Sequence, residues 1–250
     1  MIIPGELIVL LRKAEYVVAL TGAGVSQESG LRTFREAHTG HWAKHRPEDL
    51  ATPQAFARNP KLIWDWYAMR RQKLKDAQPN PAHFALVEMA RYILEFKLIT
   101  QNVDGLHLKA GSPGVVELHG NIQRVKCSSC NKQAHSWNDI DEEVPRCDYC
   151  GDLLRPDVVW FNESLPRDEL EFAIEAARSC QVFFSIGTSG IVQPAASLAY
   201  GARNRGAVLI EINTESTPLT TKTDFALYGK AGEILPELVR EVWGTNVSGI

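Results

Sequence analysis

The stretch that decides the fold is Ala19-Leu-Thr-Gly-Ala-Gly-Val-Ser-Gln-Glu-Ser-Gly-Leu-Arg-Thr-Phe-Arg35. The apolar run Tyr16-Val-Val-Ala-Leu20 leads into it and predicts a buried strand. Gly22 and Gly24 follow, and glycine lets the backbone turn sharply and approach a ligand closely. A helix that opens after such a turn presents free N–H groups to an anion, so the stretch predicts a pyrophosphate site.

The glycine pattern matches the dinucleotide-binding fingerprint only in part. Gln27 stands at the third glycine position, and no acidic residue closes a second strand about twenty residues later. The Gly-x-Gly turn alone is therefore also compatible with an ordinary tight turn. The polar side chains that follow favour a ligand site, because they should gather around the same loop: Ser29, Arg32, Thr33 and Arg35.

Composition and patterning indicate an ordinary α/β protein. The 250 residues allow one large domain, or a core with a small insert, and 44% of them are hydrophobic. Short apolar strands alternate with helical segments, which predicts a parallel, doubly wound sheet. The net charge of -3 opposes a dedicated nucleic-acid binder. No apolar run is long enough to cross a bilayer, and the first residues do not resemble a signal peptide, so we expect a cytoplasmic protein.

Two Cys-x-x-Cys pairs predict a metal site. Cys127-Ser-Ser-Cys130 and Cys147-Asp-Tyr-Cys150 are separated by sixteen residues, a spacing typical of four thiolates around one structural Zn²⁺. Disulfides are the alternative, and the absence of a signal peptide disfavours them. A nucleic-acid-binding ribbon is opposed by the acidic residues between the pairs, which are Asp139, Asp141, Glu142 and Glu143.

A predicted helix carries a charge on its apolar face. It starts at Asn59-Pro60, a good N-cap followed by a good first residue, and runs to Leu74. Arg70 follows Tyr67 by three residues on the apolar stripe, so the two side chains are neighbours. Arg70 can have a structural role, in which its charged end reaches water or forms an internal ion pair. Alternatively, its guanidinium binds the carboxylate of a ligand beside the Tyr67 hydroxyl. The adjacent Arg71 competes for this role, but the spacing favours Arg70.

Polar residues also follow other predicted strands. Gln101-Asn-Val-Asp104 comes directly after the apolar run 96–100, at the kind of strand end where α/β sheets bind ligands. Its side chains either cap their own turn or meet a ligand. His119 ends a further apolar run before Gly120, so we expect it to be exposed at a strand end. An imidazole there is suited to accept a proton from a hydroxyl.

Together these motifs resemble those of the sirtuins, the NAD-dependent protein-lysine deacylases. The resemblance is carried by Gly-Ala-Gly-Val-Ser-x-Glu-Ser-Gly-Leu-x-Thr-Phe-Arg at 22–35, Thr-Gln-Asn-Val-Asp-Gly-Leu-His at 100–107 and Glu-Leu-His-Gly at 117–120. It implies an α/β fold, a Rossmann-like parallel sheet with helices on both faces plus a small inserted zinc-ribbon module. The implied NAD-binding domain comprises residues 1–120 and 156–250, and the implied zinc module residues 121–155.

The same resemblance implies roles for individual residues. His119 would be the general base, while Asn102 and Asp104 would position the nicotinamide amide and a water or hydroxyl. NAD is implied as a co-substrate that the reaction consumes, and the zinc ion as structural. The implied NAD-binding residues are Gly22, Ala23, Gly24, Ser26, Glu28, Thr33, Phe34, Arg35, Gln101, Asn102, Val103, Asp104, Gly187, Thr188, Ser189, Asn213, Thr214, Glu215 and Ala231.

One sirtuin class, the desuccinylases and demalonylases, has Tyr-x-x-Arg where this chain has Tyr67-Ala-Met-Arg70. The resemblance therefore implies removal of succinyl, malonyl and acetyl groups from lysine, giving nicotinamide, O-acyl-ADP-ribose and free lysine. It also implies that Val159, Trp160 and Phe161 pair with the substrate peptide as an added strand. Asn162 stands where relatives have glycine, and because Asn tolerates positive φ we expect the turn to be kept.

Several alternatives remain at this point. They are a plain deacetylase with a structural Arg70, an ADP-ribosyltransferase that uses the same NAD site, a non-catalytic reader of NAD or acyl-lysine, and, on the glycine turn alone, a dehydrogenase. The expected partners are acylated lysine side chains of proteins, and neither nucleic acid nor membrane is expected. The sequence leaves the oligomeric state open, a monomer included.

Overall fold

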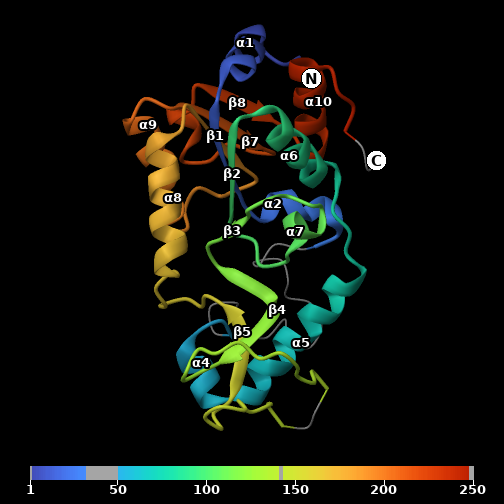
Figure 1. Ribbon diagram of the computed structural model, residues 1–250, viewed down its shortest axis with the longest axis vertical. Helices are drawn as coiled ribbons and strands as arrows, with labels where there is room; N and C mark the ends of the chain where they lie inside the picture. Colours follow the sequence, from blue (N-terminus) through green and yellow to red (C-terminus); the bar gives the residue numbers. More distant parts are fainter. Residues whose placement is uncertain (1, 32–49, 141–142, 248–250) are drawn as a thin grey trace.

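The main body of the computed structural model is a six-stranded sheet whose neighbouring strands run parallel (Figure 1). The structure describes residues 2–31, 50–140 and 143–247. The strand order is β3-β2-β1-β6-β7-β8, so the ends of β2, β1, β6 and β7 meet along one edge of the sheet. The strands are β1 (Tyr16–Thr21), β2 (Glu95–Thr100), β3 (Val116–Glu117), β6 (Val182–Ile186), β7 (Val208–Asn213) and β8 (Phe225–Tyr228).

Helices cover both faces of this sheet because side chains alternate between the faces along each strand. On β1, Val17 and Ala19 belong to one apolar core, whereas Val18 and Leu20 belong to the other. This arrangement confirms the predicted fold. The first core packs against α1 (Gly5–Lys13), α6 (Pro81–Tyr92) and α10 (Ala231–Trp243), and the second against α8 (Arg167–Ser179) and α9 (Ser197–Asn204).

A smaller unit lies at the other end of the molecule (Figure 1). The strands β4 (Gly120–Cys127) and β5 (Leu154–Val158) form an antiparallel pair. The helices α4 (Pro53–Arg58) and α5 (Pro60–Asp76) share its apolar core, in which Trp66 packs with apolar residues of β4 and β5. The unit thus draws on chain segments both before and after β2, while its exact boundaries at 121 and 155 remain a prediction.

The local signals in the sequence place most elements well. The Asn59 side chain accepts from Leu62 N at 3.1 Å, as expected of the N-cap of α5. The strand β8 was not anticipated, because it is a short edge strand without alternating burial.

The short helices are α2 (Ala23–Ser26), η1 (Gln27–Ser29), α7 (Leu106–Lys109) and η3 (Thr220–Lys222). Within the described ranges, no helix combines the length and apolarity that a membrane crossing requires.

Candidate active site

Two glycine turns meet at the edge of the sheet. Gly24 N donates to Gly187 O at 2.9 Å, and a Cβ on Gly24 would lie only 2.7 Å from the Gly187 Cα. Gly187 also has a φ of +60°, in the left-handed region that favours glycine. The turns after β1 and β6 are therefore glycine-dependent because their backbones touch each other.

A cavity of about 260 Å³ opens beside these turns. Glu28 lies on its rim, and its carboxylate accepts from Gly232 N at 2.8 Å at the start of α10. The cavity brings together residues from four separate segments that the sequence analysis assigned to NAD, so its lining fits one end of a dinucleotide. The residues that line it are Gly24, Gln27, Glu28, Gly187, Ile212, Asn213, Thr214, Gly229, Lys230 and Ala231.

The remaining residues assigned to NAD divide into two groups. Those that the structure describes lie in turns at or next to the same strand ends: Gly22, Ala23, Ser26, Gln101, Asn102, Val103, Asp104, Thr188, Ser189 and Glu215. Thr33, Phe34 and Arg35 lie outside the described residues, as does Arg32.

Hydrogen bonds join the turn after β1 to the turn after β2. Ser26 Oγ donates to Asp104 Oδ2 at 2.7 Å, and Asn102 Nδ2 donates to Gly22 O at 3.0 Å and to Ser26 Oγ at 3.1 Å. Asp104 Oδ1 also accepts from Leu106 N, so the Asx turn that was left open does form. Burial raises the pKa of Asp104 despite these hydrogen bonds. The result is a polar cluster beside the glycine turn.

His119 lies in the turn between β3 and β4, where it is half-buried and not exposed as expected. Its Nδ1 is 2.9 Å from Gln101 O, and a carbonyl accepts only from an N–H. This bond therefore leaves the lone pair of the neutral ring on Nε2. Burial lowers the pKa of His119, so the ring is neutral near pH 7. A neutral, oriented imidazole is a competent general base.

Tyr67 and Arg70 do lie together on α5. The Tyr67 ring is buried, and its hydroxyl oxygen accepts from Trp160 Nε1 at 3.0 Å. The Arg70 guanidinium lies 5.0 Å from the centroid of the Trp66 ring and 5.7 Å from that of Tyr67. Burial lowers the pKa of Arg70, while attraction to Tyr67 and Asp104 opposes the shift. Arg70 is thus electrostatically coupled to the polar cluster that follows β2.

Arg71 has a different environment from that of Arg70. It is 5% exposed, and its Nε lies 2.9 and 3.0 Å from the two carboxylate oxygens of Asp139. Its guanidinium also lies 4.9 Å from the centroid of the Trp64 ring. Arg71 therefore ties α5 to the loop after β4.

The segment from Val159 to Phe161 directly follows β5, and Trp160 packs in the apolar core of the smaller unit. Its three N–H groups donate to His119 O, the Glu163 carboxylate and Ala51 O. A substrate strand would therefore have to use other backbone groups of this segment. Asn162 has a φ of +68°, which confirms the expected turn.

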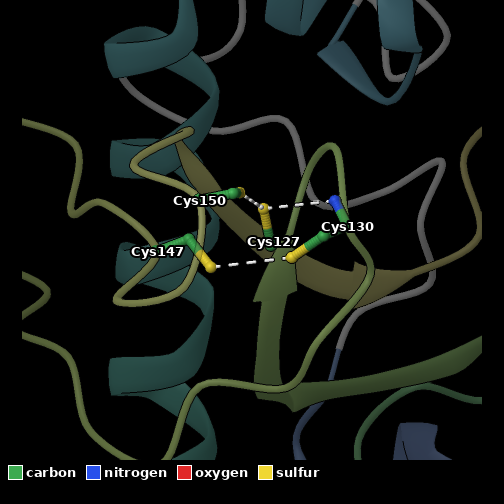
Figure 2. A group of neighbouring side chains, drawn as sticks. All are labelled: Cys127, Cys130, Cys147 and Cys150. Carbon is green, nitrogen blue, oxygen red and sulfur yellow. Dashed lines mark hydrogen bonds between the residues drawn. The ribbon is translucent and has the colours of Figure 1, made fainter.

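The four paired cysteines converge at one point (Figure 2). Their sulfur atoms all lie within 4.8 Å of one another, with 3.4 Å between Cys127 and Cys150 and 3.7 Å between Cys130 and Cys147. A disulfide needs about 2.05 Å, whereas a tetrahedron with Zn–S bonds of about 2.3 Å has sulfur atoms about 3.8 Å apart. The cluster therefore fits one zinc ion with no open coordination position, as predicted.

The comparison with known proteins identifies the family. The profile of the Sir2 family matches residues 22–194, which span both glycine turns, His119 and the four cysteines. The chain belongs to the Sir2 family.

Named relatives match this Sir2-family chain over nearly its whole length. An "NAD-dependent protein deacylase" of Pyrococcus furiosus is 49% identical over 245 residues, covering 95% of this chain and 97% of the relative. "NAD-dependent protein deacylase 1" of Archaeoglobus fulgidus is 50% identical over 239 residues, with 95% and 97% covered.

Solved Sir2 structures support the same family assignment. A Sir2 homolog–NAD complex superposes with a TM-score of 0.91 at 49% identity, covering 96% of this chain and 94% of the other. A Sir2–p53 peptide–NAD⁺ complex gives a TM-score of 0.84 at 29% identity, with 98% and 100% covered.

The sequence analysis did not identify the Arg155–Glu163 pair in this Sir2-family chain. Arg155 donates through Nη1 and Nη2 to the two carboxylate oxygens of Glu163, at 2.6 and 2.8 Å. Its guanidinium also lies 3.4 Å from the centroid of the Trp160 ring. The pair holds the 159–163 turn in place, and no periodic pattern could reveal it, because the turn at Asn162 brings the two side chains together.

Proposed function

We propose that this chain removes acyl groups from protein lysines in an NAD-dependent reaction and that it prefers acyl groups ending in a carboxylate. As a Sir2-family enzyme it is an NAD-dependent protein deacylase, as its relatives are named. The preference for succinyl and malonyl groups over acetyl is the finer part of the proposal.

One observation carries this preference: Arg70 lies beside Tyr67 on α5 and is coupled to Asp104 in the polar cluster. An acyl-lysine that reaches the polar cluster would bring the far end of its acyl group close to Arg70. A guanidinium forms strong paired hydrogen bonds with a carboxylate, and Tyr67 adds a hydroxyl donor. An acetyl group has no charge for Arg70 to bind.

The residues of the chain then have distinct tasks. The cavity beside Gly24 and Gly187 holds the adenosine end of NAD, and Asn102 and Asp104 orient the nicotinamide end. Bound NAD would supply the electrophilic ribose carbon, with nicotinamide as the leaving group and the acyl oxygen of the substrate as the nucleophile. His119 Nε2 would accept a proton from a ribose hydroxyl, and with water as a co-reactant the acyl group would pass from lysine to the ribose as O-acyl-ADP-ribose. The cysteine cluster stays outside this chemistry because all four of its ligand positions are filled by the protein.

The substrate peptide would lie along the segment from Val159 to Phe161. Because the three N–H groups of this segment are already bonded, the peptide would pair with its carbonyl oxygens and with the turn at Asn162. We propose that this segment binds the peptide backbone while α5 selects the acyl group.

The test measures nicotinamide release with matched acetyl-, malonyl- and succinyl-lysine peptides. Faster turnover of the two acidic substrates is expected. Arg70→Met should raise KM for the succinyl peptide about tenfold to a hundredfold, the effect of losing a charge-assisted pair of hydrogen bonds. The acetyl peptide should change little. Lys73→Met removes an exposed charge from the same helix and serves as the matched control.

Equal losses on both substrates, or faster turnover of acetyl, would make Arg70 structural and the enzyme a plain deacetylase. If no peptide releases nicotinamide and radiolabelled NAD marks a protein instead, the enzyme is an ADP-ribosyltransferase and the proposal is wrong.

A further inference from the structure

Two histidines outside the site described above are buried against each other. His83 on α6 is fully buried, His107 on α7 is 2% exposed, and their ring centroids are 4.7 Å apart. His107 is hydrogen-bonded to Thr21 at the end of β1, and His83 is hydrogen-bonded to Asn80 at the N-cap of α6.

The hydrogen bonds determine which nitrogen of His107 carries the proton. Its Nε2 is 2.9 Å from Thr21 Oγ1. The Thr21 hydroxyl donates its own hydrogen to Thr100 Oγ1 at 2.8 Å, so only lone pairs are left for His107. In a neutral imidazole one nitrogen donates and the other accepts. His107 must therefore be the Nε2–H tautomer, with a lone pair on Nδ1.

This chain of bonds ends in the polar cluster. Thr100 Oγ1 accepts from Asn102 N at 3.0 Å as well as from Thr21. Thr21 is the last residue of β1 and directly precedes Gly22, whose carbonyl accepts from Asn102 Nδ2. His107 thus supports the closed ring of contacts that holds the β1 turn against the β2 turn.

We propose that His107 is a positioning residue for NAD: its Nε2–H fixes the Thr21 hydroxyl, which aligns the Gly22 turn with Asn102. The proposal rests on the NAD-dependent reaction proposed above. It concerns neither proton transfer to substrate nor acyl selection.

The surroundings of His83 indicate how the Nε2–H tautomer of His107 is maintained. Asn80 N donates to His83 Nδ1 at 3.2 Å, which places the hydrogen of neutral His83 on Nε2. His83 Nε2 and His107 Nδ1 are therefore a buried donor and a buried acceptor, and neither has a partner among the described residues. Burial lowers the pKa of His83 to about 4 and that of His107 well below its usual value, consistent with two neutral rings.

A third buried polar atom lies in the same turn. Ser112 N donates to His107 O at 3.0 Å, and Ser112 Oγ is also unpartnered within the described part of the chain. One donor, one acceptor and one hydroxyl are the usual three partners of a buried water molecule. We infer that one water bridges the two histidines with Ser112 and satisfies the Nδ1 lone pair of His107.

The first test needs no activity. Long-range ¹⁵N–¹H correlation spectra of imidazole-labelled protein at pH 7 should show both His83 and His107 as Nε2–H tautomers. A crystal structure at high resolution should show the bridging water. Detection of an Nδ1–H tautomer at His107 would overturn the proposal, because Thr21 would then have no donor.

The second test compares variants that keep or remove the donor. His107→Gln retains an N–H at nearly the same distance, whereas His107→Leu does not. The leucine variant should raise KM for NAD about fivefold, the size of one lost buried hydrogen bond, with KM for the acyl peptide unchanged. The glutamine variant should recover most of the loss. Thr21→Val and Thr21→Ser form a matched pair that should behave in the same way.

The outcomes separate this proposal from the proposed function. If the wild type shows no NAD-dependent turnover, the proposed function fails, while the tautomers can still be measured. If the wild type is active and His107→Leu leaves KM for NAD unchanged, or shifts both KM values equally, the positioning role is wrong. Thr21→Val covers the case in which His107→Leu does not fold.

Discussion

The indole N–H of Trp160 donates to the hydroxyl oxygen of Tyr67 at 3.0 Å. This bond joins the segment proposed to bind the peptide to the helix proposed to select the acyl group. It also orients Tyr67, because a lone pair of the hydroxyl is occupied and its hydrogen must point elsewhere. Burial raises the pKa of Tyr67 to about 12, so the hydroxyl remains a donor at physiological pH.

Trp160→Phe should therefore weaken the binding of acidic acyl groups. Phenylalanine keeps an aromatic ring between Phe56 and Arg155 but leaves the Tyr67 hydroxyl unoriented. We expect KM for a succinyl peptide to rise about fivefold, with KM for an acetyl peptide nearly constant. Trp243→Phe, in α10 and stacked on Tyr92, is the control for a tryptophan far from the site. A similar rise in KM for both peptides would show that Trp160 does not contribute to the selection of the acyl group.

The pH dependence of deacylation should follow His119. The base acts when neutral, and burial puts its pKa below the ordinary 6.5. The value of kcat/KM should therefore be constant from pH 7 to 8 and should fall only as the pH drops through that lowered pKa. Profiles of the wild type and of His135→Gln, which removes an exposed histidine, should coincide. An acidic limb centred above pH 6.5 would contradict the assignment.

Metal removal should destabilise the small unit around β4 and β5 more than the six-stranded sheet. Cys127 and Cys147 pack with Trp64 and Val125 in a core of their own, apart from the two cores of the main sheet. A chelator should release one Zn²⁺ per chain, change the fluorescence of Trp64 and abolish peptide turnover, because closed zinc sites supply folding energy.

Far-ultraviolet circular dichroism should keep most of the helical signal after chelation. Cys150→Ser should lower the zinc content, whereas Cys180→Ser, in the core beside α8, should not. Retention of zinc in Cys150→Ser would argue against a four-thiolate site.

Arg71→Met should reduce stability without changing substrate choice. It removes the cation from an ion pair in which Arg71 is buried and Asp139 is 29% exposed. We expect the free energy of unfolding to fall by about 2 kcal/mol, below the usual figure for a fully buried pair because water reaches Asp139. Urea titrations of Arg71→Met and Arg70→Met measure this difference. The ratio of succinyl to acetyl turnover should change in Arg70→Met alone, and a changed ratio in Arg71→Met would refute the distinction.

The sequence by itself determined the features that depend on neighbouring residues. The apolar runs place β1, β2, β6 and β7, the Asn59-Pro60 pair places the start of α5, and the spacing of the cysteines indicates zinc. The positive φ of Asn162 was expected because sirtuins have glycine at this position and Asn tolerates positive φ. Each of these follows from backbone sterics, capping or ligand spacing over a few residues, so distant parts of the chain do not alter it.

The tertiary structure alone decided which polar side chains act together. Trp160 meets Tyr67 across 93 positions and Thr21 meets His107 across 86, distances over which no sequence period operates. Arg70 and Arg71 are adjacent in the sequence, yet one is coupled to Asp104 and the other binds Asp139. Burial makes the difference: in a dry interior each donor requires a particular acceptor, and only the packing of the elements decides which acceptor is within reach.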